Sequence, residues 1–361
     1  MQLTQKQLHE VLAEIQPVDV GMMDRAQERL DSLTKPLGSL GVLETMARRL
    51  CGISQTMTPS VARKIILTFA GDHGVVSEGV SSVPQEVTQQ MVYNFLSGGA
   101  GVNVLARHVG ADVRVVDVGV AADVSADGLI CANVMKGTAN FTQGPAMDPR
   151  QALASIAVGM ETARQAIDDG AEILGSGEMG IGNTTPSSAL FAVLLNIDVE
   201  DVTGRGTGID DKALENKIEV IKKGIRSNRH LMNGPLETLA AVGGLEIGAI
   251  CGMILESARN RIPVVVDGFI SSAGALVAMK MKKEVLDYCF FSHMSAEQGH
   301  RIFFKETGLK PILDLDMRLG EGTGAALAMN VIEASVKILT EMATFAEAGV
   351  NAEAHLKKNT Q

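Results

Sequence analysis

Short apolar runs alternate along this chain with longer segments in which apolar residues recur every three or four positions. The first short run, residues 64–70 (Lys-Ile-Ile-Leu-Thr-Phe-Ala), ends at the polar turn Gly71-Asp-His-Gly74. Runs of this kind predict buried strands, and the longer periodic segments predict helices. Further strands are expected at residues 112–119, 171–174, 262–267 and 287–291, and helices at 85–109, 150–169, 244–259 and 297–306. Strands separated by helices predict an α/β fold with a mostly parallel sheet and right-handed crossovers.

Both ends of the chain have a helical pattern without strands. Up to about residue 60 the apolar positions keep helical spacing, interrupted at Lys35-Pro-Leu-Gly38, and residues 324–349 are predicted to form one long helix rich in Ala, Met, Val and Ile. That helix is expected to pack against the N-terminal helices or a second subunit. A length of 361 residues favours one large domain with an appendage.

Composition and charge narrow the function classes. The chain has 38 glycines, no Trp and 2 Tyr, and its net charge is −10 with Lys and Arg spread along the sequence, so nucleic-acid binding is not expected. Four widely separated cysteines indicate neither a zinc site nor a disulfide framework, and we expect four buried thiols: Cys51, Cys131, Cys251 and Cys289. With no signal-peptide pattern and no apolar run of membrane-span length, the sequence predicts a cytoplasmic protein without membrane partners.

Two carboxylates flanked by glycines are the strongest candidates for chemistry. Glu178 lies in Gly175-Ser-Gly-Glu-Met-Gly-Ile-Gly-Asn-Thr-Thr185, and Glu321 in Arg318-Leu-Gly-Glu-Gly-Thr-Gly324. Glycine lets backbone approach a ligand closely, and each segment places one ionisable group there. Other polar clusters follow predicted strands, where α/β sheets bind ligands: Asp72-His73, Asp117, Asp267-Gly268 and Ser292-His293-Met-Ser295.

The glycine loop at 175–180 formally matches the dinucleotide-binding pattern G-x-G-x-x-G, with Asp198 at a plausible distance for a ribose contact. Against this, Glu178 would place a carboxylate inside the pyrophosphate turn, and Thr185 as N-cap with Pro186 behind it makes a better helix start. The alternative is a cradle for a single anionic group at residues 180–185. A second candidate cradle is 204–208, followed by a helix that carries Lys217.

Glu321 follows a predicted strand or turn at 311–316 and allows two interpretations. It is either an acidic residue in the first turn of the next helix or a general base shielded by Leu319 and other apolar groups. Burial would raise its pKa and a helix N-terminus would lower it, so the sequence leaves the balance open. His73, His293 and His300 lack metal-ligand spacing, and no G-x-S-x-G elbow is present; satisfied polar residues at strand ends, with substrate contact as an alternative, are expected instead.

Four ordered motifs carry a resemblance to a known family. Residues 177–186 (Gly-Glu-Met-Gly-Ile-Gly-Asn-Thr-Thr-Pro), 319–328 (Leu-Gly-Glu-Gly-Thr-Gly-Ala-Ala-Leu-Ala), 35–41 (Lys-Pro-Leu-Gly-Ser-Leu-Gly) and 70–75 (Ala-Gly-Asp-His-Gly-Val) resemble nicotinate-nucleotide:dimethylbenzimidazole phosphoribosyltransferases of cobalamin nucleotide-loop assembly. The resemblance implies transfer of 5-phosphoribose from nicotinate mononucleotide to 5,6-dimethylbenzimidazole with inversion, giving α-ribazole 5′-phosphate and nicotinate, without metal or redox cofactor. It also implies a homodimer with a large Rossmann-like domain (residues 61–324) and a small helical domain (residues 1–60 and 325–361).

The resemblance also assigns roles to residues. Glu321 matches the family's catalytic glutamate, which takes the proton from the attacking benzimidazole nitrogen, and Glu178 is the supporting carboxylate. The implied phosphate and ribose contacts are Gly180, Asn183, Thr184, Thr185, Gly206, Lys217 and Ser295. The implied base contacts are Val83, Pro84, Gln90, Met91, Met179 and Leu319, with Val83 and Met91 standing where some relatives carry polar residues. An NAD-dependent oxidoreductase and a nucleotide-binding regulatory protein are the rival functions.

Overall fold

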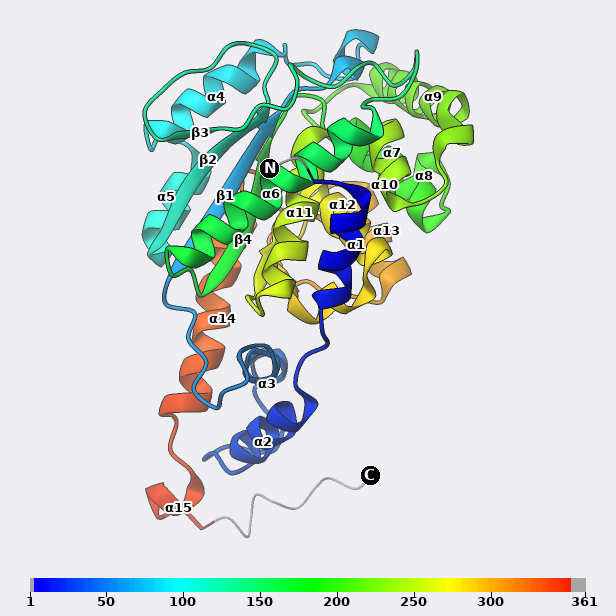
Figure 1. Ribbon diagram of the computed structural model, residues 1–361. Helices are drawn as coiled ribbons and strands as arrows, with labels where there is room; N and C mark the ends of the chain where they lie inside the picture. The colour runs from blue at the N-terminus through cyan, green and yellow to red at the C-terminus, as the bar shows by residue number, and fades with distance from the viewer. Residues whose placement is uncertain (1–2, 352–361) are drawn as a thin grey trace.

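A parallel sheet forms the centre of the protein, whose computed structural model describes residues 3–351 (Figure 1). Its six strands in this part of the chain are β1 (Lys64–Gly71), β2 (Ala111–Gly119), β3 (Leu129–Cys131), β4 (Ile173–Met179), β5 (Val264–Val266) and β6 (Cys289–Phe291). Their order across the sheet is β3-β2-β1-β4-β5-β6, and all neighbours run parallel. Every residue of β1 is buried, as expected for a strand covered on both faces. The predicted α/β class and parallel sheet are confirmed.

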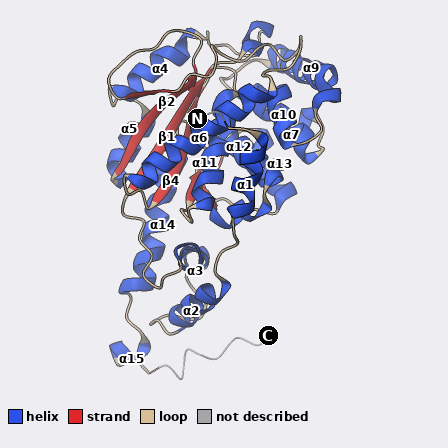
Figure 2. Ribbon diagram, in the orientation of Figure 1, coloured by secondary structure: helices blue, strands red, loops and turns tan. Residues whose placement is uncertain are grey.

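Helices flank this sheet, and Figure 2 shows how they outnumber the strands. The α-helices of the described chain are α1 (Gln5–Glu14), α2 (Val20–Asp31), α3 (Val42–Ser54), α4 (Glu86–Leu96), α5 (Gly101–Val109), α6 (Pro149–Asp168), α7 (Thr184–Leu195), α8 (Val199–Val202), α9 (Asp211–Asn228), α10 (Pro235–Val242), α11 (Leu245–Arg259), α12 (Phe269–Met281), α13 (Gln298–Thr307), α14 (Thr323–Glu341) and α15 (Phe345–Ala348). Short 3-10 helices occupy 74–78, 229–231 and 283–288, and two further strands, β7 (His293–Met294) and β8 (Leu313–Asp314), pair with each other. None of the helices in residues 3–351 is long and apolar enough to cross a membrane.

Strand β4 is longer than its apolar residues indicate. The predicted strand at 171–174 runs on to Met179, so Glu178 lies in the strand and not in a loop after it. Gly177 explains the difference, because a Cβ there would lie 2.2 Å from the backbone oxygen of Glu321. The glycines of this segment therefore make room for a neighbouring backbone, and the G-x-G-x-x-G match does not form a pyrophosphate turn.

Three predicted helices have different limits in the structure. The segment 85–109 is divided into α4 and α5 at Gly98, whose φ of +75° suits glycine and ends the first helix. Helix α14 stops at Glu341, and α15 follows separately. Helix α7 starts two residues earlier than predicted, with Asn183 and not Thr185 at the N-cap. The segment 311–316 contributes only the two residues of β8.

Helices α2 and α3 from the N-terminal part of the chain and the far end of α14 come together below the sheet in the view of Figure 1. Helices α2 and α3 and the end of α14 share a small apolar cluster: Ala26, Leu30, Leu33, Ala47, Cys51 and Leu339. The loop motif at 35–41 lies here, and its Lys35 forms a buried ion pair of 2.8 Å with Glu44 of α3. Helix α1 instead adds Leu8 and Val11 to the core of the sheet domain. Residues 1–2 and 352–361 of the predicted small domain lie outside the described residues.

The four cysteines carry free thiols, as predicted. Cys51, Cys251 and Cys289 are buried, and burial raises the pKa of the Cys51 thiol to about 11. The expectation that all four are buried is wrong for Cys131, which is exposed at the end of the edge strand β3.

Candidate active site

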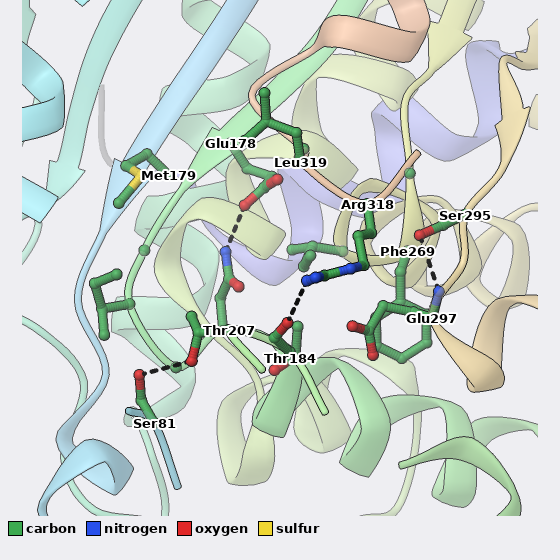
Figure 3. A pocket seen from close by; sticks show the side chains of 18 of the residues that line it. Ser81, Glu178, Met179, Thr184, Thr207, Phe269, Ser295, Glu297, Arg318 and Leu319 are labelled. Atoms are coloured by element: carbon green, nitrogen blue, oxygen red, sulfur yellow. Dashed lines mark hydrogen bonds between the residues drawn. The ribbon is translucent and has the colours of Figure 1, made fainter. Parts of the chain in front are cut away.

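A cavity of about 360 Å³ opens at the carboxyl ends of the central strands. The strand order reverses between β1 and β4, and ligands of open α/β sheets bind at such a switch point. The cavity walls come from the loop before α4 (80–83), the end of β4 and the start of α7 (178–184), residues 206–207, the start of α12 (268–270), the turn at 318–320, and His293, Ser295 and Glu297. Figure 3 shows Arg318 extending across this space, with Glu178 and Leu319 on one side and Thr184 on another.

One part of the cavity is built for an anion. Lys217 of α9 is completely buried, and its Nζ donates to Thr184 Oγ1 at 2.7 Å and to the carbonyl of Gly204 at 3.1 Å. Gly206, with a φ of +52°, lies against the same groups: a Cβ there would be 2.8 Å from Thr184 Oγ1. Thr184 also opens helix α7, whose N-terminus favours negative charge. Lysine, hydroxyl and helix terminus together form a phosphate-sized cradle.

Burial lowers the pKa of Lys217 to about 8, although Glu297 acts in the opposite direction. A dianionic phosphate placed on the cradle would favour the charged ammonium and so restore the usual state of the lysine. We therefore expect Lys217→Met, which keeps the length of the side chain and removes its charge, to raise the KM for a phosphorylated substrate about 30-fold. Steady-state kinetics measure this change. Lys212→Met, on the exposed side of the same helix, is the matched control, and equal KM values for the two variants would contradict the cradle.

Glu178 stands between the cradle and the turn that carries Glu321. Its Oε2 accepts a hydrogen bond from Asn183 Nδ2, and its Oε1 accepts one from the backbone N–H of Glu321 at 3.3 Å. Burial raises the pKa of Glu178 to about 8, with further contributions from the Asp267 and Glu246 carboxylates. With this pKa, Glu178 is mostly protonated near pH 7.

This raised pKa links protein stability to pH. Between the ordinary pKa of 4.5 and the folded value of about 8, folded Glu178 keeps a proton that the unfolded chain has lost. The free energy of unfolding must then fall as pH rises through this interval, by about 1.4 kcal/mol per pH unit. We expect Glu178→Gln, which cannot ionise, to lose less stability than the parent between pH 6 and pH 9. Thermal unfolding at both pH values tests this, with Glu161→Gln on exposed α6 surface as control, and parallel losses in parent and Glu178→Gln would refute it.

Glu321 is held in an uncommon backbone conformation. Gly320, Glu321 and Gly322 have φ values of +80°, +65° and +102°, and a residue with a side chain is strained in this left-handed region. Besides the bond from the Glu321 amide to Glu178, two contacts hold the turn: Thr68 Oγ1 of β1 donates to the Glu321 carbonyl at 3.1 Å, and the Gly322 amide donates to Asp267 at 3.1 Å. The turn is thus tied to β4, to β1 and to the residue that follows β5.

The carboxylate of Glu321 points at the start of a different helix from the expected one. Its Oε2 accepts from the Val102 amide of α5 at 3.3 Å, whereas the N-terminus of α14 is capped by Asp267, which accepts from the Ala325 amide at 2.9 Å. Burial raises the pKa of Glu321, opposed by the hydrogen bond from Val102 and increased by the Asp267 charge. The balance that the sequence left open therefore favours the raised value, which makes the carboxylate a stronger base.

Leu319 and Glu321 lie against the same residue of α5. A Cβ on Gly101 would stand 2.8 Å from Leu319 Cδ2 and 3.4 Å from Glu321 Oε2, so the expected shielding of the carboxylate by Leu319 stays a prediction. Leu319 is 60 % exposed, while Glu321 is 6 % exposed. Glu321 itself is not among the residues that line the cavity, although its neighbours Leu319 and Gly320 are, so the carboxylate lies just behind the cavity wall.

The structure brings most predicted contact residues together. Those that line the cavity are Val83, Glu178, Met179, Gly180, Asn183, Thr184, Gly206, Ser295 and Leu319, with Lys217 reaching it through Thr184. Those outside its walls are Pro84, Gln90, Met91 and Thr185; Pro84 and Gln90 are exposed, and Thr185 is buried in α7.

The sequence analysis did not single out several residues of the cavity. Arg318 donates to the Gly206 carbonyl at 3.2 Å and so joins the Glu321 turn to the anion cradle. Ser82 and Thr207, whose hydroxyl oxygens lie 3.0 Å apart, join the two loops that close the opposite side, and Figure 3 shows the neighbouring contact of Ser81 with Thr207. Arg318 stands directly before the Leu-Gly-Glu-Gly motif, which was the available signal, whereas Ser82 and Thr207 carry none.

The histidines of the polar clusters have defined partners or places. His73 Nε2 lies 2.9 Å from Glu246 Oε1, and both side chains are buried. Burial lowers the pKa of His73, but the charge and the hydrogen bond of Glu246 together with the Asp72 charge outweigh it, so the pKa is raised. Burial lowers the pKa of His300 to about 3. Its Nδ1 accepts from the Ser295 amide at 2.9 Å, so it fixes the backbone beside the cavity. Within residues 3–351, no group of three or more His, Cys, Asp or Glu side chains is placed to hold a metal ion.

Comparison with known proteins gives one consistent result. A family model described as "Phosphoribosyltransferase" matches residues 15–350. Nicotinate-nucleotide–dimethylbenzimidazole phosphoribosyltransferases of Geotalea uraniireducens and Geobacter sulfurreducens are 59 % and 57 % identical over 344 residues, covering 95 % of this chain and 98 % of each relative. The crystal structure of CobT from Thermus thermophilus is 47 % identical, covers 92 % of this chain and 99 % of its own, and has a TM-score of 0.88.

Proposed function

Because the chain belongs to the nicotinate-nucleotide–dimethylbenzimidazole phosphoribosyltransferase family, we propose that it transfers 5-phosphoribose from nicotinate mononucleotide to 5,6-dimethylbenzimidazole. The protein is thus a phosphoribosyltransferase, and the resemblance noted from the four sequence motifs is confirmed. The observation that supports this reaction best is a buried carboxylate, Glu321, joined through Glu178 and Arg318 to a lysine cradle of phosphate size.

The phosphate of the mononucleotide would bind on Lys217, Thr184 and the Gly206 backbone, with Gly180, Asn183 and Ser295 around it. A single phosphate held at one end fixes the rest of the nucleotide along the cavity toward Glu178 and the Glu321 turn. Holding both reactants in this geometry supplies a large part of the rate acceleration of a two-substrate reaction.

Glu321 would act as the general base. A benzimidazole nitrogen attacks the anomeric carbon of ribose, and the N–H proton of the same ring must leave as the new C–N bond forms. The buried carboxylate of Glu321, with its raised pKa, is the acceptor for that proton. The aromatic base would lie against Val83, Met179 and Leu319, which form the apolar side of the cavity. Pro84, Gln90 and Met91 complete the proposed base site only if the 83–91 segment moves inward on binding.

The departing nicotinate needs no acid. The electrons of the breaking bond neutralise the positive charge of the pyridinium nitrogen, and attack from the opposite face converts a β-nucleotide into an α-riboside. Positive charge then develops on the ribose, close to Glu178. The cationic pyridinium nucleotide favours the ionised form of Glu178 on binding, with the proton released to solvent, and the carboxylate then stabilises the charge that develops on the ribose.

The test is the balance of products from the purified protein. With nicotinate mononucleotide and 5,6-dimethylbenzimidazole, nicotinate and α-ribazole 5′-phosphate are expected in equal amounts, and the NMR coupling of the anomeric proton reports the inversion. An oxidoreductase would need added NAD and a redox substrate, and a regulatory protein would bind the nucleotide without releasing nicotinate. Absence of nicotinate release would therefore refute the proposal, while release with another aromatic acceptor would correct only the base.

The remaining features of the proposal concern the whole molecule. We place the large domain at residues 61–324 and the small helical domain at residues 1–60 and 325–361, which the separate cluster around Leu30 and Leu339 supports and the packing of α1 on the sheet domain qualifies. We also propose a homodimer, which sedimentation equilibrium tests directly. The free thiols agree with a reducing compartment such as the cytoplasm.

A further inference from the structure

We propose that His293 holds a ribose hydroxyl of the nucleotide through its Nε2 atom, an inference that rests on the phosphoribosyl transfer proposed above. His293 opens the short strand β7, its side chain is 1 % exposed, and it lines the cavity. Its Nε2 has no hydrogen-bond partner in the described structure. Nε2 lies on the side of Gly268, which also lines the cavity, and a buried polar atom without a partner is costly unless a ligand supplies one.

The hydrogen bonds around His293 determine which ring nitrogen carries the proton. The Ser292 hydroxyl donates to the carbonyl of Asp267 at 2.6 Å, and a carbonyl only accepts. The single hydroxyl proton of Ser292 is thus used. The contact of 2.9 Å between Ser292 Oγ and His293 Nδ1 therefore requires an N–H on Nδ1. In the neutral ring Nε2 is then an acceptor, and the ligand must offer it a donor.

Two neighbouring glycines leave room for the imidazole ring of His293. A Cβ on Gly324 would lie 2.0 Å from His293 Nδ1, so the ring fits only because that position has no side chain. On the other side a Cβ on Gly268 would still be 3.7 Å from Nε2. The carboxylate of Asp267, whose charge acts on the ring, already accepts hydrogen bonds from the amides of Gly322 and Ala325. No protein donor is left for Nε2 among these neighbours.

The mononucleotide has few donors to offer. Its phosphate and carboxylate oxygens accept hydrogen bonds, and its aromatic ring has no N–H, so the two ribose hydroxyls are its donors. Position agrees with this choice. His293 and Ser295 lie two residues apart, both line the cavity, and such a separation in extended chain spans about 7 Å. If Ser295 borders the phosphate, His293 stands at the depth of the ribose ring.

The decisive experiment combines variants with deoxy analogues of nicotinate mononucleotide. His293→Asn keeps a donor toward Ser292 and removes the atom that faces the cavity, whereas His293→Gln keeps an acceptor near the position of Nε2. In the parent protein one of the 2′-deoxy and 3′-deoxy analogues should lose about 10-fold or more in kcat/KM. In His293→Asn, kcat/KM for nicotinate mononucleotide itself should fall by a similar factor, and the sensitive deoxy analogue should then react no more slowly than the full nucleotide. His293→Gln should recover part of the lost kcat/KM.

Additive losses, with the same deoxy penalty in parent and His293→Asn, would overturn the contact. A loss that depends on the acceptor base and not on the deoxy position would assign His293 to the benzimidazole instead and also overturn it.

Nitrogen-15 NMR of the histidine rings gives a second test that needs no folded variant of His293→Asn. The Nε2 resonance should be that of an unprotonated nitrogen and should shift with nicotinate mononucleotide alone; a protonated Nε2 or no shift refutes the proposal. Because no acceptor base is present, this outcome is independent of whether transfer occurs.

Discussion

Replacing Glu321 with glutamine should lower kcat by about 10²- to 10⁴-fold and leave nucleotide binding largely unchanged. The amide has the shape of the carboxylate, and its oxygen can still accept from the Val102 amide, so the turn at 320–322 keeps its structure. What disappears is the affinity for a proton. Because burial raises the pKa of Glu321, the parent enzyme should also lose activity toward acid pH as this group becomes protonated.

Two measurements separate loss of the base from loss of the fold. The rate of nicotinate release over a range of pH should show an acidic limb in the parent that is missing in Glu321→Gln, and the thermal unfolding temperatures should agree within a few degrees. Turnover equal to that of the parent would remove Glu321 from the role of base. A large fall in unfolding temperature would instead indicate that the carboxylate serves the structure of the α5 terminus.

The second large effect is expected from Gly177→Ala, at a residue that is not among those lining the cavity. The new Cβ would stand 2.2 Å from the Glu321 carbonyl oxygen and 2.7 Å from Thr68 Oγ1. Backbone must move to relieve this overlap, and the hydrogen bond from Thr68 to that carbonyl is lost with it. A displacement of about 1 Å at a reacting group costs on the order of 100-fold in rate, and overpacking costs about 1–3 kcal/mol of stability.

Gly144→Ala is the matched control, because a Cβ at that position meets no atom within 4 Å. It should keep both kcat and unfolding temperature. Single-turnover nicotinate release distinguishes the two variants even when part of the Gly177→Ala protein unfolds, because only folded molecules contribute to the burst. Parent-like rates in Gly177→Ala would show that the turn at 320–322 tolerates displacement and that its fixed geometry is not needed for catalysis.

These two residues also show where sequence reasoning succeeds and where it fails. Continuous apolar runs such as residues 64–70 predict buried strands directly, since a strand covered on both faces has no polar side to show. Gly177 hides a strand, because Gly175 and Gly177 so close together are a pattern that is also typical of a loop. Pairing with β1 keeps residues 175–179 extended, and the backbone of Glu321 occupies the space where a side chain of residue 177 would lie; no local pattern records either contact.

The site shows the same division. Glycine-flanked carboxylates and a predicted helix start with Thr185 as N-cap point to a ligand-binding region from the sequence alone, whereas the sequence placed Lys217 only on the helix after a second, separate cradle at 204–208. Its contact with Thr184 joins two helices whose spacing in sequence carries no signal. Asp267 was expected only as a polar residue at a strand end, yet it caps α14 and holds the Glu321 turn, because β5 lies beside β4 in the sheet.

The left-handed conformation of Glu321 matters for any attempt to raise the thermal stability of this protein. Asparagine adopts that conformation with less strain than glutamate, so a variant with Asn at 321 gains stability while it loses the proton acceptor. A laboratory selection for stability at high temperature alone, without a requirement for turnover, will therefore favour inactive variants with a substitution at residue 321. Screens of the family should score product formation first and melting temperature second.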